Sequence, residues 1–345
     1  MRLSVIIPTY NVAPYVGRSI RSVLAQSGDD TEIIVVDDGS SDGTAALCTE
    51  LLESAPSIPS RLITQRHAGV SAARNAGARA ATGDYLLFLD GDDYVSPQLV
   101  SQLRGVLQTE SPDIVCWGFD TVTPDTMVIG HYFEHFRPPT ERPLGGLALT
   151  RHLVRGDFSI WMGSAAFRRS FLSRYTINFT EGCRSGEDRE FIYKAACRSE
   201  VTVFIPQTLS FYVARPGSMT RSGDIRQFDS VQAHIRASHY LAAASQNEES
   251  NNLAESILIN NAVGGYFRHL ENCMRYGEHA NMKDLLLEID RRYPGLNQCM
   301  RRIMKRRVQR STKPALGTAL FLLSPSLFWR ALVMRRRSAG EVRAL

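Results

Sequence analysis

Residues 85–93 read Tyr-Leu-Leu-Phe-Leu-Asp-Gly-Asp-Asp, so that an apolar run ends in three carboxylates. A continuous apolar run of this length is typical of a central strand in a parallel sheet, which is covered on both faces. Ligands of open α/β sheets bind at the carboxyl ends of the strands, and grouped carboxylates there favour Mg²⁺ or Mn²⁺. An EF-hand calcium loop is excluded, because its sixth and twelfth positions would be Val95 and Ser101. A solvated turn without a metal is the alternative.

This stretch is the last of four strand-like segments that alternate with helix-like segments. The four strand-like segments are residues 3–7, 33–36, 62–64 and 85–89. Their order predicts an α/β fold with a mostly parallel sheet, right-handed crossovers and flanking helices. Residues 120–145 look like an irregular loop, whereas residues 226–293 have the apolar periodicity of helices. We therefore expect a helical extension after the sheet.

Composition limits the class of protein. A chain of 345 residues with 43% hydrophobic content is long enough for two domains, or for one domain with an extension. Its six cysteines show no Cys-x-x-Cys spacing, so neither a zinc site nor a disulfide framework is expected. The sequence begins with a strand-like run in place of a signal peptide, which predicts a cytoplasmic location.

Basic residues gather at the C-terminal end. Residues 291–345 hold 14 Lys or Arg and one acid, a net charge of +13, so the overall charge of +5 leaves −8 for residues 1–290. Such asymmetry indicates a segment that meets an acidic surface, either a membrane or a nucleic acid.

We favour the membrane for this segment. Residues 301–345 combine arginine-rich stretches with the apolar stretch 315–323 and with Trp329, which suits a headgroup boundary. Pro325 and Arg330 interrupt the apolar residues, so an interfacial anchor is expected and a spanning helix is not. Nucleic acid is not expected as a partner, because no recognised module is present. A solvated basic tail is the alternative.

Several motifs together resemble glycosyltransferase family 2, of the bacterial surface-polysaccharide type. They are Ser-Val-Ile-Ile-Pro-Thr-Tyr-Asn (4–11), Val-Asp-Asp-Gly-Ser-Ser-Asp-Gly-Thr (36–44), Gly-Val-Ser-Ala-Ala-Arg-Asn-Ala-Gly (69–77), the stretch 83–93, Gly-Glu-Asp-Arg-Glu-Phe (186–191) and, more weakly, 211–220. The resemblance covers about residues 1–220 and implies the GT-A fold, in which a nucleotide diphosphate sugar is the donor. We therefore expect a GT-A catalytic domain at 1–225, a helical extension at 226–300 and the basic, membrane-associating tail at 301–345.

The family pattern implies a donor site. Its predicted members are Pro8, Tyr10, Asp38, Arg74, Asn75, Asp90 and Arg215. The ring of Tyr10, next to Pro8, is expected to lie against the base, and Asp38 to accept a hydrogen bond from a uracil N–H. Arg74 is expected to bind phosphate oxygens, and Asn75 to bind sugar or ribose hydroxyls. In isolation, each motif also fits a structural role as a turn, a helix cap or a surface arginine.

The carboxylates of 90–93 are expected to act through a metal. Asp90 would contact the ribose or the metal, and Asp92 would coordinate Mn²⁺ or Mg²⁺, which stabilises the leaving diphosphate. Asp93 is expected to support the turn. Arg215 resembles part of a late basic loop that folds over the diphosphate in relatives, although Gly217 stands near the place of their frequent His.

Asp188 is the predicted general base. Displacement at the anomeric carbon needs a carboxylate on the face opposite the leaving diphosphate, within reach of the acceptor hydroxyl. The N-terminal dipole of the helix would keep the Asp188 carboxylate ionised, and Glu187 is expected to orient a sugar or acceptor hydroxyl. The similarity to inverting members of the family implies inversion. Acids that merely stabilise the helix dipole are the alternative.

Two further residues leave a role open. His67 stands where many relatives carry Asn, a departure from the family pattern in the loop before Gly69. Trp161 is either an acceptor-sugar platform or a core residue.

Together these features predict a metal-dependent, inverting hexosyl- or N-acetylhexosaminyl-transferase. It would move sugar from a nucleotide-sugar donor, expected to be a UDP-sugar, to a surface glycan or a lipid-linked glycan, at the inner face of the plasma membrane. The alternatives are a transferase that acts on a polyprenyl phosphate and a non-catalytic sugar-nucleotide-binding protein. A nucleotidyltransferase is disfavoured, because no Gly-rich, Lys-bearing phosphate loop lies near the N-terminus.

Overall fold

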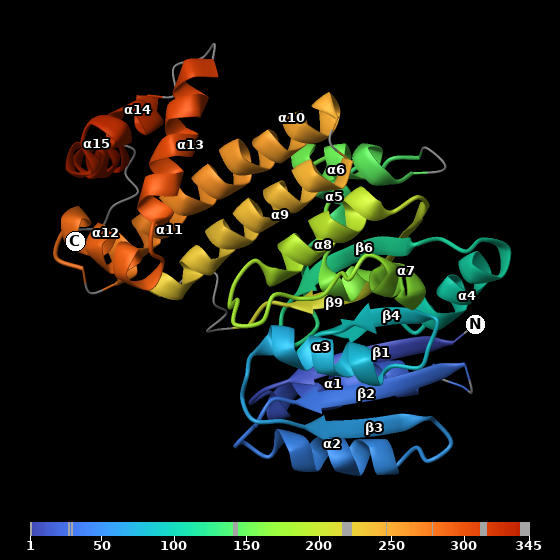
Figure 1. Cartoon of the computed structure of the whole chain (residues 1–345). Helices are drawn as coiled ribbons and strands as arrows, with labels where there is room; N and C mark the ends of the chain where they lie inside the picture. Colours follow the sequence, from blue (N-terminus) through green and yellow to red (C-terminus); the bar gives the residue numbers. More distant parts are fainter. Residues whose placement is uncertain are drawn as a thin grey trace.

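A mixed sheet with helices on both faces forms the N-terminal part of the protein, and a group of helices forms the C-terminal part (Figure 1). The computed structural model describes residues 2–26, 28, 30–140, 144–215, 223–245, 247–277, 279–310 and 316–338. Within these residues the sheet has nine strands in the order β3-β2-β1-β4-β8-β6-β9-β5, and β7 pairs with β6.

The first four segments of the sheet confirm the parallel arrangement expected from the sequence. The strands are β1 (Leu3–Thr9), β2 (Thr31–Asp37), β3 (Ser60–Thr64), β4 (Tyr85–Phe88), β5 (Tyr94–Val95), β6 (Ile114–Val122), β7 (Val128–Gly130), β8 (Ala165–Arg168) and β9 (Thr202–Val213). Parallel pairing joins β3, β2, β1 and β4, with Ile6 opposite both Ile34 and Phe88. Beyond β4 the sheet becomes mixed, because β8 runs antiparallel between β4 and β6. The expected loop at 120–145 contains the end of β6, strand β7 and a short helix.

Helices cover both faces of the sheet. They are α1 (Ala13–Leu24), α2 (Thr44–Glu53), α3 (Val70–Ala80), α4 (Leu99–Thr109), α5 (Tyr132–His135), α6 (Gly146–Arg155), the short η1 (Met162–Ser164), α7 (Arg169–Arg174) and α8 (Glu187–Arg198). Alternate residues of β1 face opposite cores, since Val5 and Ile7 pack with α1, α2 and α4 while Ile6 packs with α3 and α8. α3 approaches β1 closely, because a Cβ at Gly77 would overlap the side chain of Ile6.

The expected helical extension follows β9. It comprises η3 (Ile225–Phe228), α9 (Asp229–Ser245), α10 (Glu248–Ser256), the π-helical η4 (Ile257–Ala262), α11 (Val263–Tyr276), α12 (Met282–Arg292), α13 (Leu296–Arg310), α14 (Leu316–Leu323) and α15 (Pro325–Ser338). A third core joins these helices through buried residues that include Phe228, Tyr266, Met300 and Met304. The extension lies beside α8 and α6 (Figure 1).

The tail begins inside this helical group. α13 runs across the expected division at residues 300 and 301, and Phe321 of α14 is buried with Tyr266 and Phe267. Among the described residues, every helix is too short or too polar to cross a bilayer. The arginine side chains expected at 335–337 lie outside what the structure describes. The division into three domains stays a prediction.

Candidate functional site

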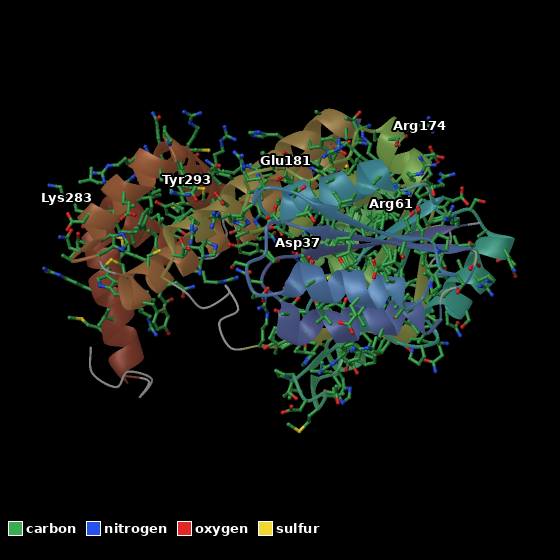
Figure 2. All side chains as sticks on the ribbon, turned by 90° about the horizontal axis from the view of Figure 1, so that it is seen from below. Asp37, Arg61, Arg174, Glu181, Lys283 and Tyr293 are labelled. Atoms are coloured by element: carbon green, nitrogen blue, oxygen red, sulfur yellow. The ribbon has the colours of Figure 1, made fainter. Side chains whose placement is uncertain are left out.

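Three strands bring the predicted donor residues to one edge of the sheet. β1, β2 and β4 are parallel neighbours, so Tyr10, Asp38 and Asp90 all follow their carboxyl ends. Figure 2 shows the polarity of the sheet, because Asp37 at the end of β2 lies nearer the C-terminal helices than Arg61 at the start of β3. The donor crevice predicted at these carboxyl ends would therefore face the helical extension. Pro8 lies one residue inside β1, where it is buried opposite Val36.

Asp38 organises the loop that leads into α3. Its Oδ1 accepts hydrogen bonds from the amide of Ala68 at 2.8 Å and from Gln65 Nε2 at 2.7 Å, and its Oδ2 accepts one from the amide of Gly69 at 2.8 Å. Gly69 has a φ of +93°, a conformation that L side chains rarely adopt. Asp38 is buried by these contacts, and its bond to a base N–H stays a prediction.

Tyr10 and His67 form a stacked pair above this loop. Their ring centroids are 4.1 Å apart with an interplanar angle of 25°, and Tyr10 is 45% exposed. His67 Nδ1 also lies 2.8 Å from Oδ2 of Asp38, which fixes the orientation of the imidazole. His67, which departs from the family pattern, is thus positioned by Tyr10 and Asp38, two of the predicted donor residues.

Arg74 is buried between acids from distant parts of the chain. Its Nη2 lies 2.7 Å from Oδ1 of Asp90, its Nη1 lies 3.2 Å from Oε1 of Glu187, and the residue is 3% exposed. Burial lowers the pKa of Arg74, but the charges of Asp90 and Glu187 outweigh burial and raise it above its usual value. The guanidinium thus joins the 90–93 carboxylates to the start of α8.

Asn75 does not turn toward this crevice. Its Nδ2 donates to the carbonyl of Phe179 and to Oε1 of Glu181, both at 3.0 Å, and its Oδ1 accepts from the amide of Phe179 at 3.0 Å. These bonds fix the segment that precedes α8. A donor-binding role for Asn75 stays a prediction.

The 90–93 carboxylates lie in different surroundings. Asp92 Oδ2 is 2.5 Å from Nε of Arg215. Asp93 is buried, and its Oδ1 accepts a hydrogen bond from the amide of Val213 at 2.7 Å, which holds the end of β9 in place. Burial and the Asp90 charge raise the pKa of Asp92, and Arg215 opposes this rise. Burial and the two neighbouring acids raise the pKa of Asp93 well above its usual value. Of the late basic loop, residues 216–220, with Gly217, lie outside the described residues.

This cluster fits a divalent ion only in part. In the described part of the chain, no group of three or more His, Cys, Asp or Glu side chains is arranged to hold a metal. Mg²⁺, however, is commonly bound by one or two carboxylates together with substrate phosphates and water. Asp90 and Asp92 are suited to supply these one or two carboxylates. A bound cation would relieve the repulsion between their negative charges.

Glu187 and Asp188 begin α8. Gly186, with a φ of +80°, turns the chain into the helix, and the close approach of Ser230 leaves no room for a Cβ at this position. Burial and the Asp188 charge raise the pKa of Glu187 to about 7, although Arg74 opposes the rise. Asp188 Oδ1 accepts the amide of Arg189 at 2.7 Å. Both acids line an open cavity, but they differ in their partners, since Glu187 pairs with Arg74 while Asp188 is held by the Arg189 amide.

The sequence did not single out Glu190, one turn further along α8. This residue is 1% exposed and accepts from Thr180 Oγ1 at 2.8 Å, Lys194 Nζ at 2.6 Å and Arg236 Nη2 at 2.7 Å. Burial raises the pKa of Glu190, but these hydrogen bonds outweigh it and lower the pKa. The sequence did contain a signal for a buried ion pair at this position. Glu190 directly precedes the apolar pair Phe191-Ile192, and Lys194 follows four residues after it. Because Arg236 belongs to α9, Glu190 ties the extension to the predicted base.

Trp161 packs against Phe119 and Tyr212, with ring centroids 5.5 and 5.7 Å away. It does not line the cavity at Asp188. Trp161 is half-buried, so its role as a sugar platform or as a core residue stays a prediction.

Comparison with known proteins gives a family and relatives. The model of the family described as "Glycosyl transferase family 2" matches residues 4–176, which is half of the chain. EpsJ of Bacillus subtilis, an uncharacterized glycosyltransferase, is 32% identical over 63% of this chain and 62% of its own length. The succinoglycan biosynthesis protein ExoO of Rhizobium meliloti is 31% identical over 67% of this chain and 65% of its own. The chain therefore spans less than two thirds of the length of these relatives.

Solved structures show the same fold. TarS 1-349 of S. aureus in complex with UDP-GlcNAc superposes with a TM-score of 0.60 at 20% identity, covering 78% of this chain and 73% of that fragment. The mannosyltransferase PcManGT of Pyrobaculum calidifontis, in complex with GDP-Man and Mn²⁺, gives a TM-score of 0.54 at 17% identity and covers 96% of this chain and 86% of its own. The expected GT-A fold is thereby confirmed.

Proposed function

Because the chain belongs to glycosyl transferase family 2, we propose that it transfers a sugar from a nucleotide diphosphate donor, a UDP-sugar, to a hydroxyl of a growing bacterial surface glycan. The observation that carries this proposal is the buried Arg74, which holds Asp90 on one side and Glu187 on the other. A transferase must bring a leaving group and an attacking hydroxyl together, and this guanidinium joins the two predicted halves of such a site. The UDP-GlcNAc bound by TarS and the role of ExoO in succinoglycan biosynthesis support the donor class and the glycan acceptor.

On the donor side, Tyr10 offers an exposed aromatic ring for the base, and Asp38 fixes the adjoining loop. Arg215 pairs with Asp92 and can turn to the diphosphate when a ligand enters. Asp90 and Asp92 would hold a divalent ion, which supplies positive charge to the departing diphosphate. The Mn²⁺ in PcManGT supports this assignment.

On the acceptor side, Asp188 removes the proton of the attacking hydroxyl. One of its oxygens is held by the Arg189 amide, so the carboxylate has a fixed orientation while it faces the cavity. Glu187, on the side of Arg74, orients the hydroxyl. A single displacement with the base opposite the leaving group inverts the anomeric centre.

We also propose that α13–α15 bind the inner face of an anionic membrane. Leu316, Leu323 and Leu327 are 73%, 83% and 52% exposed, and Arg302 and Lys305 are exposed on α13. Exposed leucines beside basic residues are the combination that favours an interfacial position.

Metal-dependent thermal stabilisation tests the donor assignment. We expect a UDP-sugar with Mn²⁺ or Mg²⁺ to raise the Tm, EDTA to remove most of the rise, and D92N to show little of it. D125N is the matched control, since Asp125 lies exposed in the turn before β7. A panel of UDP-sugars without any shift would overturn the assignment. A wild-type shift without release of UDP in the presence of any acceptor would indicate a sugar-nucleotide-binding protein instead.

A further inference from the structure

A cavity of about 700 Å³ lies between the start of α8 and the helical extension. Glu187 and Asp188 line one side, and residues of η3, α9, η4 and α11 line the other. No residue assigned above to the donor lines this cavity. The cavity is therefore on the acceptor side of the predicted base, and most of its far wall comes from outside the region that the family model matches.

Positive charge dominates the cavity wall. Its five arginines are Arg155, Arg184, Arg189, Arg226 and Arg268, and its three acids are Glu187, Asp188 and Asp224. Asp224 is paired with Arg226, with Oδ2 2.7 Å from Nε, so this pair is neutral overall. In the described structure, the Arg189 guanidinium is bonded to Ser159 Oγ at 3.2 Å and Arg268 has no acidic partner. The spare charge thus resides on Arg155, Arg184, Arg189 and Arg268, and of these Arg189 and Arg268 are the two whose charges, with that of Asp188, act on His234.

The two cavity histidines are neutral hydrogen-bonding groups. His234 Nδ1 lies 2.6 Å from the carbonyl oxygen of Ser230, so Nδ1 carries the proton and Nε2 is left as an acceptor. Burial, with the charges of Arg189 and Arg268, lowers the pKa of His234. Burial and Arg268 likewise lower the pKa of His269 to about 4. Both ring nitrogens of His269 are bonded within the protein, to Gln227 Oε1 at 2.9 Å and Ser230 Oγ at 2.7 Å, so His234 Nε2 is the ring nitrogen that suits a sugar hydroxyl, and the anion is left to the arginines.

The π-helical η4 adds an unsatisfied acceptor. The side-chain amide of Asn261, which lines the cavity, interacts with the hydroxyl of Tyr193, while its Oδ1 is buried without a hydrogen-bond partner among the described residues. π-helical turns are rare and frequently occur at functional sites, and a hydroxyl donor would satisfy this oxygen.

A second cavity extends the first. It has a volume of about 650 Å³ and shares Val154, Arg155 and Asn260 with the cavity at Asp188. Arg151, Glu248, Glu249 and Asn252 line it together with Val154 and Leu253, and apolar surface makes up the larger part of its wall. The two adjoining cavities together form a groove between α6, α10 and η4, whose charged part is the cavity at Asp188.

We propose that this groove binds an acidic glycan, whose carboxylate or phosphate group is held by Arg189 and Arg268 so that a neighbouring hydroxyl reaches Asp188. This inference rests on the proposed function and names its acceptor class. Arg226 is held by Asp224 and does not take part. The extension is thus the part of the protein that selects the acceptor.

The test measures binding of labelled oligosaccharides to the full chain in the absence of donor. Tetragalacturonate and a phosphorylated maltotetraose are expected to bind at least tenfold tighter than neutral maltotetraose at about 150 mM salt. R268A and R189A are expected to lose at least tenfold in affinity for the acidic probes, and R268K to lose less. R291A, in an exposed position on α12, and K305A, in the basic tail, are expected to bind as the wild type does.

Three results would overturn the inference. Equal binding of acidic and neutral probes would remove the charge selection, and losses in K305A that match those in R268A would place binding on the tail. Binding of a short polyprenyl phosphate that depends on Arg268, without binding of the acidic glycans, would assign the groove to a lipid acceptor. Because donor is absent from these measurements, thermal stabilisation by a UDP-sugar reports separately on the proposed function.

Discussion

Nη1 of Arg74 lies 3.2 Å from Oε1 of Glu187, across a separation of 113 positions in the sequence. The contact places the start of α8 against α3, and the same guanidinium reaches Asp90 at 2.7 Å. The order of the motifs along the chain did not show that Asp90, on the donor side, and Glu187, on the acceptor side, both contact the Arg74 guanidinium. Removal of this cation would leave Glu187 and Asp90 without their shared partner, so Arg74 is central to the stability as well as to the chemistry of the site.

Asp188→Asn is expected to lower kcat at least about 100-fold, because an amide cannot accept the proton of the attacking hydroxyl. The Tm shift caused by the donor should remain close to that of the wild type, since Asp188 lies outside the predicted donor residues. The measurement is the rate of UDP release with acceptor present.

Asp284→Asn is the control for that variant. Asp284 also lies in the first turn of a helix, α12, but it does not line the cavity. Loss of activity in both variants would favour the helix-dipole explanation, and near-normal transfer by D188N would contradict the role of a general base. It would agree with an acceptor that is already anionic at the attacking oxygen.

Glu187→Gln is expected to change how stability depends on pH. The pKa of Glu187 is about 7 in the folded protein against an ordinary value of 4.5, so the folded state binds this proton more tightly. The wild type should therefore lose free energy of unfolding as pH rises from about 4.5 to about 7, on the order of 3 kcal/mol, and E187Q should not show this loss. Urea unfolding at pH 5 and pH 8 measures the difference. E50Q, which alters an exposed acid of α2, should follow the wild type, and parallel curves for wild type and E187Q would refute the expected titration.

Glu190→Gln is expected to lower the free energy of unfolding by about 3 kcal/mol, because Lys194 and Arg236 lose a buried carboxylate. Glu249→Gln on α10 is the control. Its ion pair with Arg151 is exposed, which predicts a loss of about 1 kcal/mol or less. Denaturant unfolding at pH 7 measures both losses, and losses of equal size would argue against a special role for Glu190.

Leu323→Glu combined with Leu327→Glu is expected to reduce flotation of the full chain with anionic liposomes several-fold, because a carboxylate replaces exposed apolar surface near basic helices. Leu287→Glu is the control, since Leu287 is 54% exposed on α12. These substitutions are preferable to truncation at residue 301, which would remove the buried Met304 and Phe321. Flotation that is unchanged in the double variant would contradict membrane binding by α14 and α15.

The sequence predicted the features that depend on local chemistry. The strands β1, β2 and β4 are apolar at most positions, and motif residues such as Asp38 and Asp90 closely follow them. Parallel strands place such residues at one edge without further information. The position and the antiparallel direction of β8 could not be predicted in this way. A strand of four residues has no periodicity that indicates its direction or its place between β4 and β6.

Contacts between distant segments could not be predicted. Asn75 follows Arg74 in the same motif, yet the turn of α3 directs it to Phe179 and away from the crevice. The cavity beyond Asp188 depends on how α9, η4 and α11 pack on α8, and no local pattern in those helices indicates it. The family resemblance ends near residue 220 and therefore says nothing about this wall.

The bonds from Glu190 to Arg236 have a consequence for the exchange of parts between related enzymes. A chimaera joined near residue 225 would take Glu190 from one parent and its partner on α9 from the other. A parent without arginine at position 236 would leave the buried carboxylate short of two hydrogen bonds, at 3.0 and 2.7 Å, and would loosen the segment that carries Asp188. Acceptor preference should therefore transfer between relatives only when α8 and α9 are moved as one block.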